Sequence, residues 1–293
     1  MINEIYFGNA NSRQTYFTLH NIARAHEKAN GRGVKVGIMD WLFGGDENKG
    51  LYAGYADVSE HPELLYEAAG HGLMMATTLR EIAPECEIYA INAVVYGEGG
   101  EELRLSHFEK GIQWAIENGM DVLTYSHAAF MGEDRVRAHA AVRRAVENGI
   151  TTTFIHNDSE YNIFPYGCME GMGYGVREGF SRKPDLNILH FDYNSLLLSM
   201  YEKYSNALKA GEPIRSGDMV PFFSFSSMSV VLGGFAAIIK QLRPDFQPSQ
   251  IKELLVWTSY RIETKGQNWY DINPCERVAD IGKAVDELCA EGQ

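Results

Sequence analysis

Short apolar runs alternate with stretches of helical character along the first third of the chain. The run from Val34 to Met39 predicts a buried strand that ends at Asp40, and the run from Glu87 to Val94 predicts a second strand. Between them, the segment from His71 to Glu81 has the character of a helix. Strand, helix and strand in this order are typical of two parallel strands joined by a crossover.

The same unit then occurs twice more. Apolar residues from Phe108 to Ile116 fall at helical spacing, and the helix is expected to stop at Asn118-Gly119, since both residues are common at helix C-termini. A strand from Asp121 to Tyr125 follows, and a second helix should end at Asn148-Gly149, before a strand from Ile150 to Ile155. This alternation predicts an α/β fold of three layers, with a mostly parallel central sheet and helices on both faces.

The last third of the chain adds two further helices. The segment from Ser227 to Leu242 is mostly apolar and is expected to be central and buried. Pro248 is well placed to open the next helix. The stretch before Ser227 fits no strand–helix unit, so we interpret residues 1–293 as a single domain with an insertion around residues 194–219.

Composition and charge narrow the range of partners. Hydrophobic residues make up 45% of the chain and charged residues 22%, as in ordinary globular proteins, and the formal net charge is -13. So acidic a surface argues against nucleic acid as a partner. The longest apolar run, Val230 to Ile239, is too short to cross a bilayer, so no membrane association is expected.

The cysteines and the start of the chain suggest a compartment. None of the four cysteines is in a C-x-x-C pair, and such wide spacing is typical of free thiols in a reducing environment. Met1 is not followed by a basic and then apolar segment, so no signal peptide is visible. The sequence therefore predicts a cytoplasmic location.

Several polar residues stand where parallel strands are predicted to end, and these ends gather functional groups. Asp40, Ser126 and Asn157 occupy such places, although each alone would also suit a turn. Asp40, His71 and Ser227 also follow one another in the order Asp, His, Ser, one of the known chain orders of a hydrolytic triad.

The segments around these residues resemble the subtilases, the subtilisin-like serine peptidases. Gly33 to Asp40 is similar to that family's first core strand and its aspartate, Gly70 to Thr78 to its histidine motif, and Phe225 to Ser229 to its serine motif. Further segments match in kind and in order: Ile82 to Ala90, Gly119 to Ser126, and Phe154 to Asn157. The resemblance spans about residues 20 to 285 and identifies the chain as a divergent member.

The resemblance implies a serine endopeptidase that hydrolyses a restricted intracellular peptide or protein. His71 would be the base that activates Ser227, Asp40 would orient the imidazole, and Asn157 would donate to the oxyanion. Substrate would bind as an added strand beside a separate group of residues: Ser126, His127 and Ala128, with His156 near the specificity pocket. No cofactor or metal is implied. Only Leu79 to Ile82 separates the histidine motif from Ala83-Pro84, which leaves no room for the calcium loop of many members.

Two departures from the family pattern support an alternative. Trp41 follows the aspartate where a small residue is usual, and Phe225 replaces a glycine before the serine. The same fold could thus serve as a catalytically silent module for peptide binding or regulation. A nucleotide-binding protein fits less well, because Gly31-Arg32-Gly33 precedes its strand instead of following it. The insertion could form a lid or a contact between two copies of the chain.

Overall fold

The computed structural model describes most of the chain outside the predicted insertion. The described residues are 17, 20–61, 70–97, 100–127, 130, 132–154, 225–261 and 277–291. No helix among them is long and apolar enough to cross a membrane.

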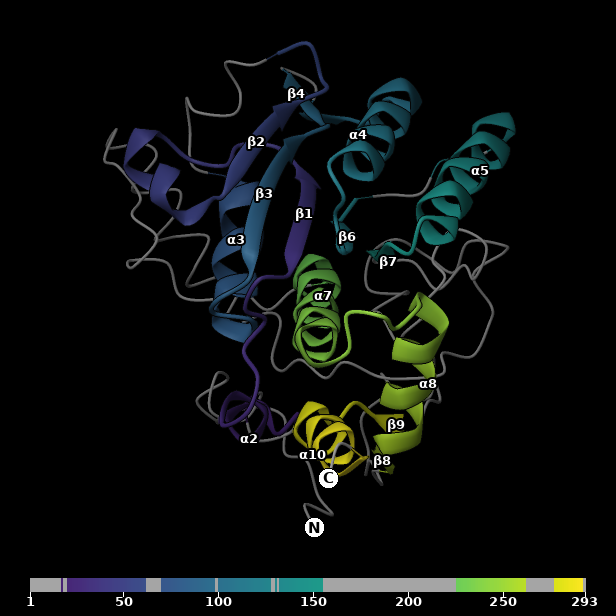
Figure 1. The fold of residues 1–293 in the computed structure, drawn as a ribbon. Helices are drawn as coiled ribbons and strands as arrows, with labels where there is room; N and C mark the ends of the chain where they lie inside the picture. The colour runs from purple at the N-terminus through teal and green to yellow at the C-terminus, as the bar shows by residue number, and fades with distance from the viewer. Residues whose placement is uncertain are drawn as a thin grey trace, which may run out of the picture.

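A five-stranded sheet lies at the centre of the molecule (Figure 1). Its strands stand in the order β2-β3-β1-β6-β7, and every neighbouring pair is parallel. The bounds are β1 Lys35–Asp40, β2 Gly54–Asp57, β3 Glu87–Asn92, β6 Val122–Tyr125 and β7 Thr151–Phe154. The predicted fold class is confirmed, and the carboxyl ends of the strands meet at one edge of the sheet.

Helices cover both faces of this sheet because the side chains of each strand alternate between two apolar cores. Val36 and Ile38 of β1 contribute to one core, together with helices α3 (His71–Ile82) and α7 (Phe225–Leu242). Met39 of β1 belongs to the other core, with helices α4 (Leu105–Glu117) and α5 (Glu133–Glu147). Three layers result, with α3 and α7 on one side and the paired helices α4 and α5 on the other (Figure 1).

The predicted helix ends agree closely with the structure. Helix α4 is capped at Asn118 and α5 at Asn148, and the glycine after each has a positive φ, 61° at Gly119 and 81° at Gly149. Glycine adopts this left-handed conformation without a Cβ penalty, so the Asn-Gly pairs do stop these helices. Helix α7 begins at Phe225, two residues before the predicted start.

One predicted strand is shorter than expected. Strand β3 ends at Asn92 instead of Val94, and an antiparallel pair of β4 (Val95–Gly97) and β5 (Gly100–Glu102) follows. The side-chain amide of Asn92 donates to Asp57 Oδ1 at 2.9 Å and to Ser59 Oγ at 2.8 Å. These bonds hold the carboxyl end of β3 to the segment that leaves β2.

The remaining described elements lie on the α3–α7 side. Helices α2 (Ile22–His26) and α10 (Ile281–Glu291) pack on each other, and α8 (Pro248–Thr258) packs against α10. Pro248 opens α8, as predicted. The short elements are η1 Asp46–Leu51, β8 Tyr260–Arg261 and β9 Arg277–Val278.

Candidate active site

Asp40 stands at the carboxyl end of the central strand β1. Asp40 lies two residues after Ile38 and four after Val36, and alternate residues of a strand point to the same face of the sheet. Its side chain therefore points toward the layer of α3 and α7, as those of Val36 and Ile38 do. The side chain is fully buried. The backbone N–H of Trp41 donates to Oδ1 at 2.9 Å, which fixes one carboxylate oxygen.

His71 is the first residue of α3 and faces this carboxylate. Its Nδ1 lies 2.9 Å from Oδ1 and 2.8 Å from Oδ2 of Asp40. The imidazole is 18% exposed, whereas the aspartate is 0% exposed. In this pair, the carboxylate is therefore shielded from solvent, whereas the imidazole is partly exposed to it.

The start of α3 is fastened to the segment that follows Asp40. Gly70 N–H donates to Leu42 O at 3.0 Å, and Gly72 N–H donates to Trp41 O at 2.8 Å. A Cβ on Gly72 would lie 2.7 Å from Trp41 O, so only glycine allows this approach. This close contact explains sterically why a glycine, Gly72, follows His71.

The charge of Asp40 is maintained in spite of its burial. Burial alone would raise the pKa of Asp40, but the neighbouring His71 and His127 stabilise the carboxylate by charge and by hydrogen bonds. The net result is a pKa well below the ordinary value. Asp40 is therefore ionised and can hold a histidine proton at Nδ1.

Ser227 lies in the first turn of α7 and is 1% exposed. The first turn of a helix carries N–H groups without intrahelical partners and the positive end of the helix dipole. An anion that develops beside Ser227 would be stabilised there.

Ser126 joins three elements around this turn. Its Oγ donates to Ser226 O at 2.9 Å and lies 2.6 Å from Ser229 Oγ, both in α7. The same Oγ lies 3.7 Å from Met75 Sδ, one turn after His71 in α3. The end of β6 therefore holds the turn of Ser227 close to the helix that begins with His71.

The next residue, His127, makes a contact that sequence analysis missed. Its Nε2 lies 3.2 Å from Asp40 Oδ1, and its ring centroid is 5.3 Å from that of His71. The side chain is buried and also packs on Tyr125. The side chains of Ser126 and His127 are both buried and contact other parts of the protein, and their predicted place along the backbone of a substrate stays a prediction.

Other predicted site residues lie outside the described part of the chain. They are Ala128, His156, Asn157 and the insertion at 194–219.

One group of described residues has the donor atoms to hold a metal ion. Asp40, His71 and His127 each offer one such atom, and these atoms all lie within 4.8 Å of one another.

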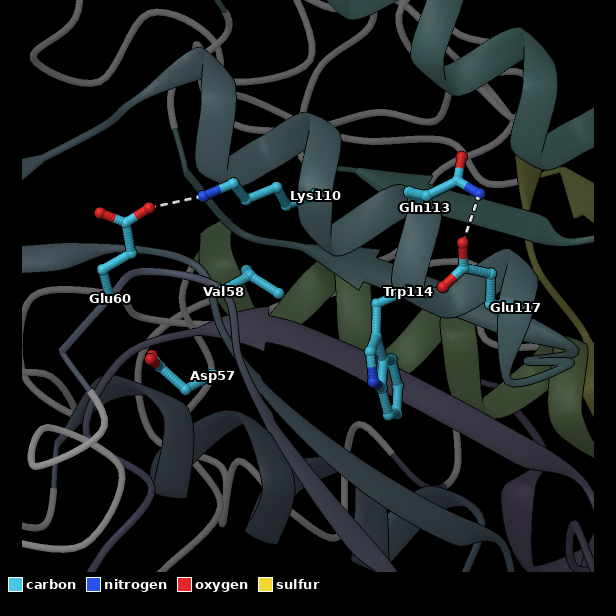
Figure 2. A pocket seen from close by; sticks show the side chains of 7 residues that line it. All are labelled: Asp57, Val58, Glu60, Lys110, Gln113, Trp114 and Glu117. Carbon is cyan, nitrogen blue, oxygen red and sulfur yellow. Dashed lines mark hydrogen bonds and ion pairs between the residues drawn. The ribbon is translucent and has the colours of Figure 1, made fainter.

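A separate hollow of about 350 Å³ lies between the end of β2 and α4 (Figure 2). Lys110 pairs with Glu60 at 2.6 Å on one side, and Gln113 donates to Glu117 at 2.9 Å on the other. Trp114 forms part of its lining. None of the described residues that line the hollow is a nucleophile or base of the candidate site.

Comparison with known proteins points to one group of enzymes. No family model matches the chain. It is 23% identical over 240 residues to the alkaline elastase YaB of Bacillus sp. (strain YaB), which covers 77% of this chain and 59% of that protein. It is 22% identical over 256 residues to the thermostable alkaline protease of Halalkalibacterium halodurans, covering 82% and 66%. The chain thus spans about three fifths to two thirds of the length of these relatives.

Solved structures give the same answer for the fold. A cold-adapted subtilisin-like serine proteinase matches with a TM-score of 0.56 at 14% identity, over 86% of this chain and 90% of that one. A lanthipeptide protease matches with a TM-score of 0.61 at 14% identity, over 97% and 100%. The chain has the subtilisin-like fold and is a divergent relative of the subtilisin-like proteases.

Proposed function

We propose that the protein is a serine endopeptidase that uses Asp40, His71 and Ser227. The observation that carries the proposal is the contact of His71 Nδ1 with both oxygens of the buried, ionised Asp40. A carboxylate in this place sets the imidazole tautomer and leaves Nε2 as the base. The two proteolytic relatives agree with this chemistry.

In the proposed reaction, His71 Nε2 takes the proton of Ser227 Oγ as that oxygen attacks the peptide carbonyl. Asp40 stabilises the imidazolium that forms, and the imidazolium then gives its proton to the leaving amine. The first turn of α7 stabilises the developing oxyanion, and Asn157 is the proposed side-chain donor. The loss of one such donor typically costs about 2.7–4 kcal/mol in the barrier.

We further propose that the substrate is a restricted intracellular peptide or protein. The described cysteines, Cys86 and Cys289, are both free thiols, which suits a reducing compartment. A ribosomally made precursor peptide would be one such substrate, in keeping with the lanthipeptide protease among the structural neighbours.

The decisive test is labelling of the full chain with a fluorophosphonate probe, which reacts with activated serines. We expect the label on Ser227 in the wild type and none in Ser227→Ala or His71→Ala. A folded wild-type protein that takes no label would contradict the proposal.

That outcome would favour the alternative, a catalytically silent module that binds peptides. Trp41 and Phe225 are the residues that favour it. Trp41 nevertheless donates its backbone N–H to Asp40, so the bulky side chain leaves the carboxylate held.

A further inference from the structure

We propose that Asp40, His71 and His127 form a binding site for one transition-metal ion of the Zn²⁺ type, and that the bound ion silences the enzyme. The silencing rests on the proposed function, whereas the binding does not. The juxtaposition that carries this inference is that of two imidazoles and one carboxylate, whose donor atoms all lie within 4.8 Å of one another.

The donor set has the chemistry that such ions prefer. Zn²⁺ binds imidazole nitrogen and carboxylate oxygen, and sites with three protein ligands leave a fourth position for water. The three residues come from separate parts of the chain, at the end of β1, at the start of α3 and just after β6. The fold brings them together, so the site exists only in the folded protein.

The spacing of the donor atoms suits a tetrahedral ion. Ligand bonds of about 2.1 Å at tetrahedral angles place the donor atoms roughly 3.4 Å apart. From Asp40 Oδ1, the observed separations are 2.9 Å to His71 Nδ1 and 3.2 Å to His127 Nε2. All three donors lie within 4.8 Å of one another. Side-chain shifts of about half an ångström would admit the ion.

The surroundings hold the ligands and leave a way in. Trp41 N–H fixes Oδ1 of Asp40, which is the kind of outer contact that orients metal ligands. The side chain of His127 is 2% exposed, whereas His71 opens to solvent and marks the side for entry and for the water ligand. The formal net charge of -13 also favours the approach of a cation.

A bound ion would remove the base. In the active form, the single ring proton of neutral His71 lies on Nδ1 toward Asp40, and the lone pair of Nε2 is free. A metal ion on Nδ1 moves that proton, through solvent, to Nε2. His71 then has no lone pair for the proton of Ser227, and attack stops until the ion leaves.

The test begins with binding, because binding can be measured whether or not the protein is a peptidase. Isothermal titration of the full chain, freed of metal by a chelator, should show one Zn²⁺ site. His127→Asn and Asp40→Asn should each weaken it at least tenfold. The matched control is His107→Asn, since His107 is another buried histidine that lies outside the site; it should bind Zn²⁺ like the wild type. Circular dichroism should confirm that each variant is folded.

Two measurements on the wild type need no variant. Co²⁺ should give the visible absorption of a tetrahedral site without a sulfur charge-transfer band. Zn²⁺ should block fluorophosphonate labelling, and a chelator should restore it. Equal Zn²⁺ binding by folded His127→Asn and wild type, or a cobalt spectrum with sulfur ligands, would overturn the proposal. If the wild type takes no probe even without metal, the peptidase proposal fails while the titration still decides the metal site.

Discussion

Replacement of Gly72 by alanine should damage the candidate site far more than it damages the fold. An added Cβ would lie 2.7 Å from the carbonyl oxygen of Trp41 and 2.9 Å from two ring carbons of Phe43. A backbone oxygen cannot swing aside as the end of a side chain can. The start of α3, and with it His71, must therefore move away from the segment that follows Asp40.

Two terms set the effect on stability. Alanine in a helix gains about 0.5–1 kcal/mol over glycine, and overpacking of a dense core costs about 1–3 kcal/mol. Gly72→Ala should therefore lower the free energy of unfolding by no more than about 2.5 kcal/mol. The effect on reactivity should be larger, because a displacement of about 1 Å in a catalytic group can reduce the rate roughly 100-fold.

The assay is the rate at which a fluorophosphonate labels Ser227, together with urea denaturation of the same samples. Gly50→Ala is the matched control, since a Cβ there has nothing within 4 Å and the backbone has no positive φ. The control should label at the wild-type rate and keep its stability. Labelling of Gly72→Ala at the wild-type rate would refute the steric argument.

Three further predictions concern other parts of the molecule. Gly234→Ala should lower the free energy of unfolding by about 1–3 kcal/mol in urea, because its Cβ would lie 2.5 Å from Cγ2 and 2.8 Å from Cβ of Ile82; unchanged stability would contradict this packing of α7 on α3. Burial raises the pKa of the Cys86 thiol to about 12, so iodoacetamide at pH 8 should leave Cys86 unmodified in the native protein and modify it in urea, as peptide mass spectrometry would show. Burial, and then the charges of Arg104 and Lys110, lower the pKa of His107, so its NMR titration should have a midpoint below 6.5. Since the folded-state pKa is the lower one, the stability that His107 contributes is present above its ordinary pKa and is lost as pH falls through the folded value. His107→Gln should flatten this part of the curve of stability against pH.

The sequence predicted the layers of the fold because its strands and helices carry strong local signals. The Asn-Gly pairs marked two helix ends, and the apolar run after Ser227 marked the central helix. Strand β2 was missed because only Ala56 among its four residues is buried, so no apolar alternation marks it.

The pairing of Asp40 with His71 was also predictable from the sequence. The two residues stand in the chain order of a hydrolytic triad, and the segments around them resemble the aspartate and histidine motifs of the subtilases. The role of the His127 side chain was not. It depends on the register that sets β6 beside β1, where Met39 pairs with Tyr125, and a long-range register has no local signal. The alternation of residues in β6 could have indicated that Ser126 faces α7, but only once α7 was placed on that side of the sheet.

The position of Ser227 on α7 ties chemistry to the integrity of the whole molecule. The residues that follow it, from Met228 to Ile239, lie inside the larger apolar core, where α7 touches α3 and three strands of the sheet. Segments with so many buried contacts open only when the protein unfolds globally. Local unfolding of surface segments would leave Ser227 in place. The proposed reactivity of Ser227 should be lost only when the apolar core around α7 unfolds. The fraction of protein that takes a covalent label on this residue would therefore report the fraction that is folded, and labelling could be used to follow denaturation.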